Sequence, residues 1–234
     1  MNKWLIYLAF LIILPCFAYE IYNANNFDLN EKESNLLFVV DFSNSMNEYL
    51  EHKTKVSSVK EMLNRILPQI SPNTNVGLRV YGHTCNILAY NACRSSELIV
   101  PLAQNNSENI SKVLTKLRPK GMTPITYSLK QAVQKDLKNI QGKKHIILLT
   151  DGGENCDESP CLYAISLIKE HRDINIDVIA FNVNDEDDLA QLKCTSDVTS
   201  GRFVEAKTNA QLFNSMQKFT EAHKQVEASI YKPE

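Results

Sequence analysis

Glycine, proline and unbalanced charge are all scarce in this sequence of 234 residues. With 7 glycines and 8 prolines the chain is neither collagen-like nor of low complexity, and no segment of about 20 to 50 residues recurs, which excludes stacked repeats. The 25 Lys and Arg residues nearly balance the 27 Asp and Glu residues. Because a net charge of −2 provides no positive field, we expect no nucleic-acid partner. The content of 44% hydrophobic and 22% charged residues favours one folded domain of moderate size.

The short motifs of several enzyme classes are also missing. The sequence contains no Gly-x-Ser-x-Gly elbow, no phosphate-binding glycine loop and no His-Glu-x-x-His pair. These absences argue against hydrolases, nucleotidases and zinc proteases. The cysteines form no Cys-x2-Cys pair, which disfavours a structural zinc site. We therefore expect a protein that is not an enzyme.

An uncharged apolar stretch stands at the start of the chain. It follows one cation and ends in small residues at Cys16 and Ala18, and it is short for a membrane span. These features predict a signal peptide at 1–18, cleaved after Ala18, and a linker at 19–34. An uncleaved anchor is the alternative, and lipidation of Cys16 is a weaker one because Pro15 precedes it. All three place the protein outside the cytoplasm, secreted or periplasmic, with membrane contact only through an uncleaved anchor.

Five cysteines remain after the predicted cleavage point. Cys85 and Cys93 enclose one short loop, and Cys156 and Cys161 enclose another. In an oxidising compartment the simplest pairing is within each loop, which leaves Cys194 unpaired. The alternative, that Cys194 pairs with one of the other four, remains open because spacing does not decide connectivity.

Apolar runs rich in β-formers alternate with segments of helical periodicity. This alternation predicts a doubly wound, Rossmann-like α/β fold: a three-layer sandwich with a six-stranded, mainly parallel sheet and helices on both faces. The third strand follows a short connection and is expected to be antiparallel at an edge. We expect the domain to span 35–222, followed by a C-terminal tail at 223–234. The predicted strands are 36–40, 76–81, 98–100, 145–149, 174–181 and 202–205. The predicted helices lie near 56–67, 107–117, 124–138 and 160–170, after Asp185, and around 212–219.

Oxygen-bearing side chains occur in three loops at the predicted carboxyl edge of the sheet, where ligands bind in doubly wound folds. Asp41, Ser43 and Ser45 alternate directly after the first strand. Thr123 precedes a helix, and Asp151 follows the fourth strand. Because these are hard oxygen donors without histidine or thiolate, they suit Mg²⁺. The sequence therefore predicts a metal site for Mg²⁺, with Mn²⁺ or Ca²⁺ as alternatives.

Plainer structural roles remain open for residues near this edge. An Asp-x-Ser-x-Ser segment alone is a common turn motif. Thr123 before Pro124 is typical of a helix N-cap followed by proline at the first helical position. We interpret His83 as a structural residue and the acidic run at 185–188 as a solvated helix N-terminus that the helix dipole stabilises.

At these residues the sequence resembles the von Willebrand factor A (vWA) domain family and its metal-ion-dependent adhesion site (MIDAS). The pattern of that site is Asp-x-Ser-x-Ser, a distant Thr, and an Asp after the fourth strand. Asp41, Ser43, Ser45, Thr123 and Asp151 match this pattern without substitution. The resemblance implies that the two serines ligate the metal directly and the two aspartates largely through water. It also implies that Thr123 is a direct ligand in some liganded states.

The resemblance covers 35–222 and sharpens toward exported bacterial members of the family. Three further segments carry it: Tyr81-Gly82-His83, Lys120-Gly121-Met122-Thr123-Pro124-Ile125, and Asp151-Gly152-Gly153-Glu154-Asn155-Cys156 followed by Pro160-Cys161. It implies an exported adhesion or assembly module that binds a protein partner through a partner Asp or Glu carboxylate.

One enzymatic alternative remains, a Mg²⁺-dependent phosphotransferase or hydrolase with Asp41 as the nucleophile. That chemistry usually needs a second carboxylate two residues later, where this chain has Ser43. A purely structural domain with an empty site is a third reading.

Overall fold

The computed structural model describes residues 34–85, 88–156, 158–170 and 172–230, and for residues 89 and 221–230 it describes the backbone alone. The predicted signal peptide and all but the last residue of the predicted linker lie outside this range. The described residues belong to one unit, Lys32–Glu234. Within them, no helix combines the length and the apolar character that crossing a membrane requires.

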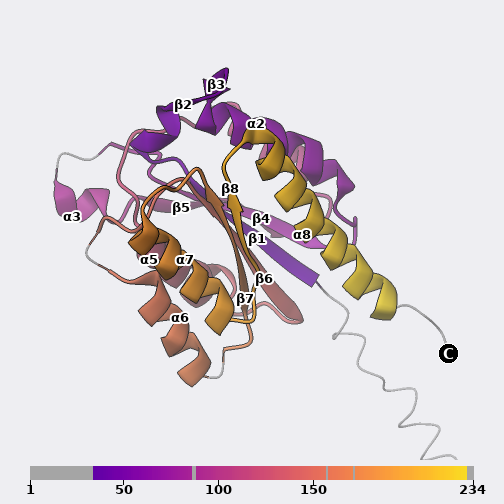
Figure 1. The fold of residues 1–234 in the computed structure, drawn as a ribbon. Coiled ribbons are helices and arrows are strands. Elements are labelled where there is room, and N and C mark those ends of the chain that lie inside the picture. Colours follow the sequence, from indigo (N-terminus) through magenta and orange to yellow (C-terminus); the bar gives the residue numbers. More distant parts are fainter. Residues whose placement is uncertain (1–33, 86–87, 157, 171, 231–234) are drawn as a thin grey trace, which may run out of the picture. The chain divides into compact units, whose positions relative to one another are not determined.

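A six-stranded sheet forms the centre of the domain (Figure 1). Its strand order is β5-β4-β1-β6-β7-β8, and β5 alone is antiparallel to its neighbour. The predicted fold class and the antiparallel edge strand are therefore confirmed. The bounds are β1 Ser34–Asp41, β4 Asn75–Tyr81, β5 Ser96–Ala103, β6 Lys143–Thr150, β7 Asn175–Phe181 and β8 Phe203–Ala206.

The strand β1 is the innermost element, and all eight of its residues are buried. Its side chains alternate between the two faces of the sheet, so that Phe38 belongs to one hydrophobic cluster and Val39 to the other. The chain builds outward from β1 to β4 and β5, then returns to β6 on the other side. This reversal creates a switch point at the carboxyl ends of β1 and β6, where doubly wound folds bind ligands.

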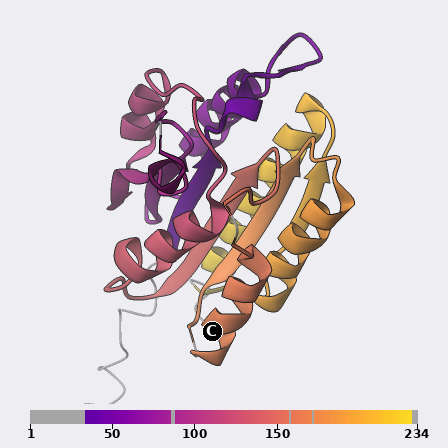
Figure 2. The same cartoon turned by 90° about the vertical axis from the view of Figure 1, so that its left-hand side faces the viewer.

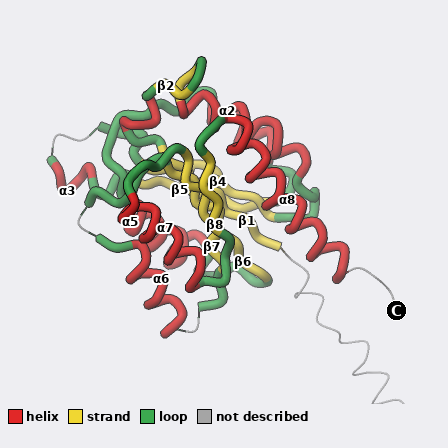
Figure 3. Tube along the Cα trace, in the orientation of Figure 1, coloured by secondary structure: helices red, strands yellow, loops and turns green. Residues whose placement is uncertain are grey.

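Helices cover both faces of the sheet, as Figures 2 and 3 show. One cluster packs α2 (Lys55–Ile66), α4 (Ser107–Leu114) and α8 (Asn209–Ile230) against the sheet. The other packs α5 (Ile125–Gln131), the π-helical turn η4 (Ala132–Asp136), α6 (Pro160–Lys169) and α7 (Glu186–Val198). Helix α8 continues into the segment expected as a C-terminal tail. The shorter elements are η2 (Asn44–Asn47), β2 (Tyr49–Leu50), β3 (Lys53–Thr54), η3 (Leu67–Gln69) and α3 (Ala89–Ala92).

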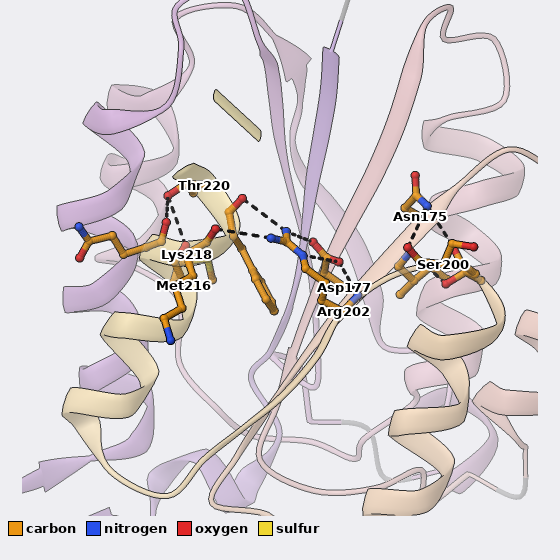
Figure 4. Close-up of polar contacts among 11 residues, drawn as sticks. Asn175, Asp177, Ser200, Arg202, Met216, Lys218 and Thr220 are labelled. Carbon is orange, nitrogen blue, oxygen red and sulfur yellow. Dashed lines mark hydrogen bonds and ion pairs between the residues drawn. The ribbon is translucent and has the colours of Figure 1, made fainter. Parts of the chain in front are cut away.

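An ion pair near the amino ends of β7 and β8 connects the sheet to α8 (Figure 4). The Arg202 guanidinium lies 2.6 Å from Asp177 Oδ2, and the backbone N–H of Arg202 donates to Oδ1 of the same carboxylate at 2.7 Å. The guanidinium also donates to the carbonyl of Phe219 at 3.4 Å and stacks over its ring at 4.2 Å. One side chain, on the residue directly before β8, thereby joins β7 to α8.

Candidate metal site

Three loops meet at the carboxyl edge of the sheet and are joined by their backbones. After β1, Phe42 N donates to Tyr81 O at 2.8 Å. Gly121 N donates to Gly82 O at 2.7 Å, and Asn44 N donates to Gly121 O at 2.9 Å. The loops after β1 and β4 and the loop before α5 therefore form one layer, which fixes where their side chains lie.

Gly82 makes this close approach feasible. Its φ of +69° is in the left-handed region, and a Cβ there would lie 2.6 Å from Ser43 N and 2.7 Å from Met122 O. Only glycine fits both the conformation and the space. Gly82, directly after β4, thus lets the loop that contains Ser43 contact the loop that contains Thr123.

A chain of hydrogen bonds connects four of the five predicted site residues. Ser43 Oγ and Ser45 Oγ are 3.0 Å apart, and Ser45 Oγ donates to Asp151 Oδ1 at 2.7 Å. Asp41 Oδ1 accepts from Ser43 N at 2.6 Å, and its Oδ2 accepts from Thr150 Oγ1 at 2.8 Å. The structure therefore brings together the two loops that the sequence placed at the ends of β1 and β6.

Thr123 reaches the same layer through its own loop. An isolated β-bridge pairs Ser43 with Gly121, two residues before Thr123. Thr123 N donates to Asn155 Oδ1 at 2.7 Å, and Asn155 Nδ2 donates to Thr123 Oγ1 at 3.4 Å. Helix α5 begins at Ile125 with Pro124 as its N-cap, so the reading of Thr123 as the cap is wrong. The loop after β6, not the helix, orients Thr123.

The two carboxylates of the site are costly to keep charged. Burial raises the pKa of Asp41 from 3.8 to about 7, and the charge of Asp151 adds to this shift. Burial also raises the pKa of Asp151, although its hydrogen bond from Ser45 opposes the change. A bound cation would relieve both effects, because it supplies opposite charge where water is excluded. With only hard oxygen donors, this set fits a small divalent cation.

The von Willebrand factor type A domain matches residues 35–221 of this chain. The chain belongs to this family. The uncharacterized protein YwmC of Bacillus subtilis (strain 168) is 27% identical over 179 residues, which cover 75% of this chain and 78% of that protein. Among solved structures, the minor pilin PilB of Streptococcus sanguinis has a TM-score of 0.67 at 14% identity, covering 87% of this chain and 64% of that one. Proximal thread matrix protein 1 from the mussel byssus, solved with its MIDAS motif occupied by zinc, has a TM-score of 0.62 at 18% identity, covering 83% and 46%. These two likenesses concern the fold.

A lysine that the sequence analysis missed lies within this vWA site. Lys55 Nζ donates to Asp151 Oδ2 at 3.0 Å and to Glu48 Oε2 at 2.8 Å, and its side chain is only 4% exposed. Burial would lower the pKa of Lys55, but the hydrogen bond to Glu48 and the charge of Asp151 outweigh it and raise the pKa. The signal was the buried face of α2, since Lys55 precedes Val59 by one helical turn.

The loop after β6 is itself held by hydrogen bonds to neighbouring residues. Glu154 accepts from Thr126 N at 2.7 Å and from Cys156 N at 3.0 Å, so its carboxylate caps the start of α5. Gly153 N donates to Asp188 Oδ2 at 3.1 Å.

Asp185 caps α7 by accepting from the backbones of the second and third residues of the helix, which confirms the helix N-terminus predicted there.

The disulfides differ from the predicted pairing. Cys93 is bonded to Cys156 with a Cα–Cα distance of 5.5 Å, and Cys161 to Cys194 with 5.3 Å, while Cys85 is free and exposed. The expected Cys85/Cys93 and Cys156/Cys161 pairs are wrong, and the alternative that Cys194 pairs with another cysteine is confirmed. The physical reason is that loops at one sheet edge, and the packed helices α6 and α7, are close in space though far apart in sequence.

We expect peptide mapping of the unreduced protein to recover the Cys93–Cys156 and Cys161–Cys194 links, with Cys85 the one cysteine among residues 34–230 that is open to alkylation. Replacing Cys161 and Cys194 together by serine should cost about 4 kcal/mol of unfolding free energy, because the bond links residues that are 33 positions apart. Urea unfolding measures this loss, and Cys85→Ser is the matched control that should change little. A peptide that joins Cys85 to Cys93 would contradict the pairing.

Proposed function

We propose that this chain is an exported, non-enzymatic protein-binding module. Asp41, Ser43, Ser45, Thr123 and Asp151 hold a Mg²⁺ ion, and the ion recognises an Asp or Glu carboxylate on a protein partner. Mn²⁺ or Ca²⁺ are the alternative cations. The observation that carries this proposal is the hydrogen-bonded layer of oxygen side chains around two buried carboxylates.

The bound ion would supply positive charge at a site whose neighbours are mostly neutral hydroxyls. Two serine hydroxyls and one threonine hydroxyl add no negative charge to that of Asp41 and Asp151, and the Lys55 ammonium offsets one of these two charges. A bound divalent cation therefore leaves net positive charge for an anionic group of the partner. The residues of this chain orient the site: Thr150 and the Ser43 backbone hold Asp41, and Asn155 holds Thr123.

Export is supported by the disulfides and by the likeness to a pilin. Two disulfides in one domain are typical of oxidising, extracytoplasmic compartments. The minor pilin from Streptococcus sanguinis shares the fold, and we extend from it only the proposal that this chain also acts outside the cytoplasm through protein contacts.

The buried position of Asp41 argues against the phosphotransferase alternative. A nucleophilic carboxylate needs one oxygen free to reach a phosphorus atom. Both oxygens of Asp41 accept hydrogen bonds, one from Ser43 N and one from Thr150 Oγ1, and the residue is fully buried. Asp41 would therefore act on a bound ion through its charge and through Ser43, which it holds in place.

Capture of a partner from cell-envelope extract tests the proposal. We expect the native protein and Thr123→Ser to retain the partner in Mg²⁺ and to lose it in EDTA. Thr123→Ala should bind it at least about tenfold more weakly, which is about 1.4 kcal/mol. Because Thr123 does not cap α5, the melting temperature of the Thr123→Ala variant should stay close to that of the native protein. Amidating the partner's carboxylates should abolish capture.

Capture that survives both EDTA and Thr123→Ala would place the contact elsewhere on the domain. Capture that needs Mg²⁺ but survives amidation of the partner would remove the carboxylate from the proposal while leaving the cation in it.

A further inference from the structure

We propose that Lys55 is a built-in counter-ion of the metal site that weakens divalent-cation binding and keeps the cation-free domain folded. This inference rests on the proposed function, because it concerns the same site. Its basis is the buried contact between the Lys55 ammonium and Asp151, whose other oxygen accepts the hydrogen bond from Ser45.

The fold places this ammonium firmly. The hairpin of β2 and β3 begins after Glu48 and ends before Lys55. Lys55 N donates to Glu48 O at 2.9 Å, and Lys55 Nζ donates to Glu48 Oε2 at 2.8 Å. Backbone and side chain of the two residues therefore close the hairpin together. A lysine held at both ends has little freedom to swing into solvent when a cation approaches.

The charges around the site then set its affinity. Asp41 and Asp151 would offer a cation two buried negative charges, but the Lys55 ammonium offsets one of them. Glu48 contributes less, since its side chain is 66% exposed and solvent screens it. An entering divalent cation therefore meets about half of the buried negative charge and is also repelled by a neighbouring ammonium.

The same ammonium stabilises the domain when no cation is bound. Without Lys55, Asp151 would be buried beside Asp41 and would lack the ammonium that now pairs with it. A loosely held cation also gains from a partner carboxylate, which adds the negative charge that Lys55 offsets. Cation and partner would then each tighten the binding of the other.

Calorimetric titration of the full chain with MgCl2, and separately with MnCl2, tests this role. We expect Lys55→Met to bind either cation about tenfold more tightly than the native protein. The matched control is Lys112→Met, which removes the same charge from an exposed pair with Glu108 and should leave the affinity unchanged. In EDTA the melting temperature of Lys55→Met should be lower than that of the native protein. Adding Mg²⁺ should raise the melting temperature of the variant by more than it raises that of the native protein.

The possible results separate this inference from the proposed function. Unchanged or weaker cation binding by Lys55→Met, while the native protein binds, overturns the counter-ion role and leaves the metal site in place. No binding heat from either protein overturns both. Folding of Lys55→Met only when Mg²⁺ is present supports the role. If Lys55→Met does not fold with or without Mg²⁺, Lys55→Gln, whose amide still donates to Asp151, decides by the same affinity criterion.

Discussion

Replacing Asp41 and Asp151 together by alanine should abolish the heat of Mg²⁺ binding. These two side chains carry the negative charge of the proposed site, and one of them anchors the serine hydroxyls through Ser45. In the native protein, Mg²⁺ at about 100 times its dissociation constant should raise the unfolding free energy by about 2.7 kcal/mol. In the double variant this gain should vanish.

The titration is best performed at pH 8. Because the pKa of cation-free Asp41 is about 7, protons compete with the cation at lower pH. The matched control is the double variant Asp187→Ala, Asp197→Ala, which removes two exposed carboxylates outside the site and should bind Mg²⁺ as the native protein does. Equal binding heat from the Asp41, Asp151 variant and the native protein would refute the site.

Gly82→Ala should destabilise the domain by about 3 kcal/mol or more and eliminate Mg²⁺ binding. The new Cβ would stand 2.6 Å from Ser43 N and 2.7 Å from Met122 O, both backbone atoms that cannot turn aside. The left-handed φ of +69° adds strain for any side chain. To relieve the clash, the loop bearing Ser43 must move away from the loop bearing Thr123.

Gly152→Ala is the matched control for this prediction. Gly152 directly follows Asp151, but a Cβ there meets nothing within 4 Å. We expect its stability to stay within about 1 kcal/mol of the native value. Urea unfolding and Mg²⁺ titration compare the two variants. Equal stability and cation affinity in both would show that the contact at Gly82 does not position the site.

The sheet was predictable because buried strands are recognisable in the sequence as short apolar runs. The apolar run of β1 lies at the centre of the sheet, where both faces are covered, and the link from β4 to β5 is short for a parallel crossover that contains a packed helix. The hairpin of β2 and β3 was not predicted, since two strands of two residues each carry no periodic pattern.

The members of the candidate site were predictable for a related reason. Asp41 is the last residue of β1, and Asp151 directly follows β6. These two strands are parallel neighbours, so their carboxyl ends lie at the same edge of the sheet. Hydrogen bonds through Ser43 and Ser45 connect the two carboxylates, whereas metal binding stays a prediction. Lys55 was overlooked because a lysine at a helix start usually lies in solvent, and its burial depends on where the hairpin places it.

Residue order alone was thus enough for the fold class, the edge strand and the loops that contain the oxygen-bearing side chains of the candidate site, because these follow from local apolar patterns and strand ends. Contacts between loops needed the folded chain. Cys93 and Cys156 are 63 positions apart yet bonded, while Cys85, only eight positions from Cys93, is free. Short spacing lowers the entropic cost of closing a loop, but it does not bring the two Cβ atoms to the distance and direction that a disulfide needs. Strand order and helix packing set the positions of the cysteine side chains, and both arise only when the whole sheet is assembled.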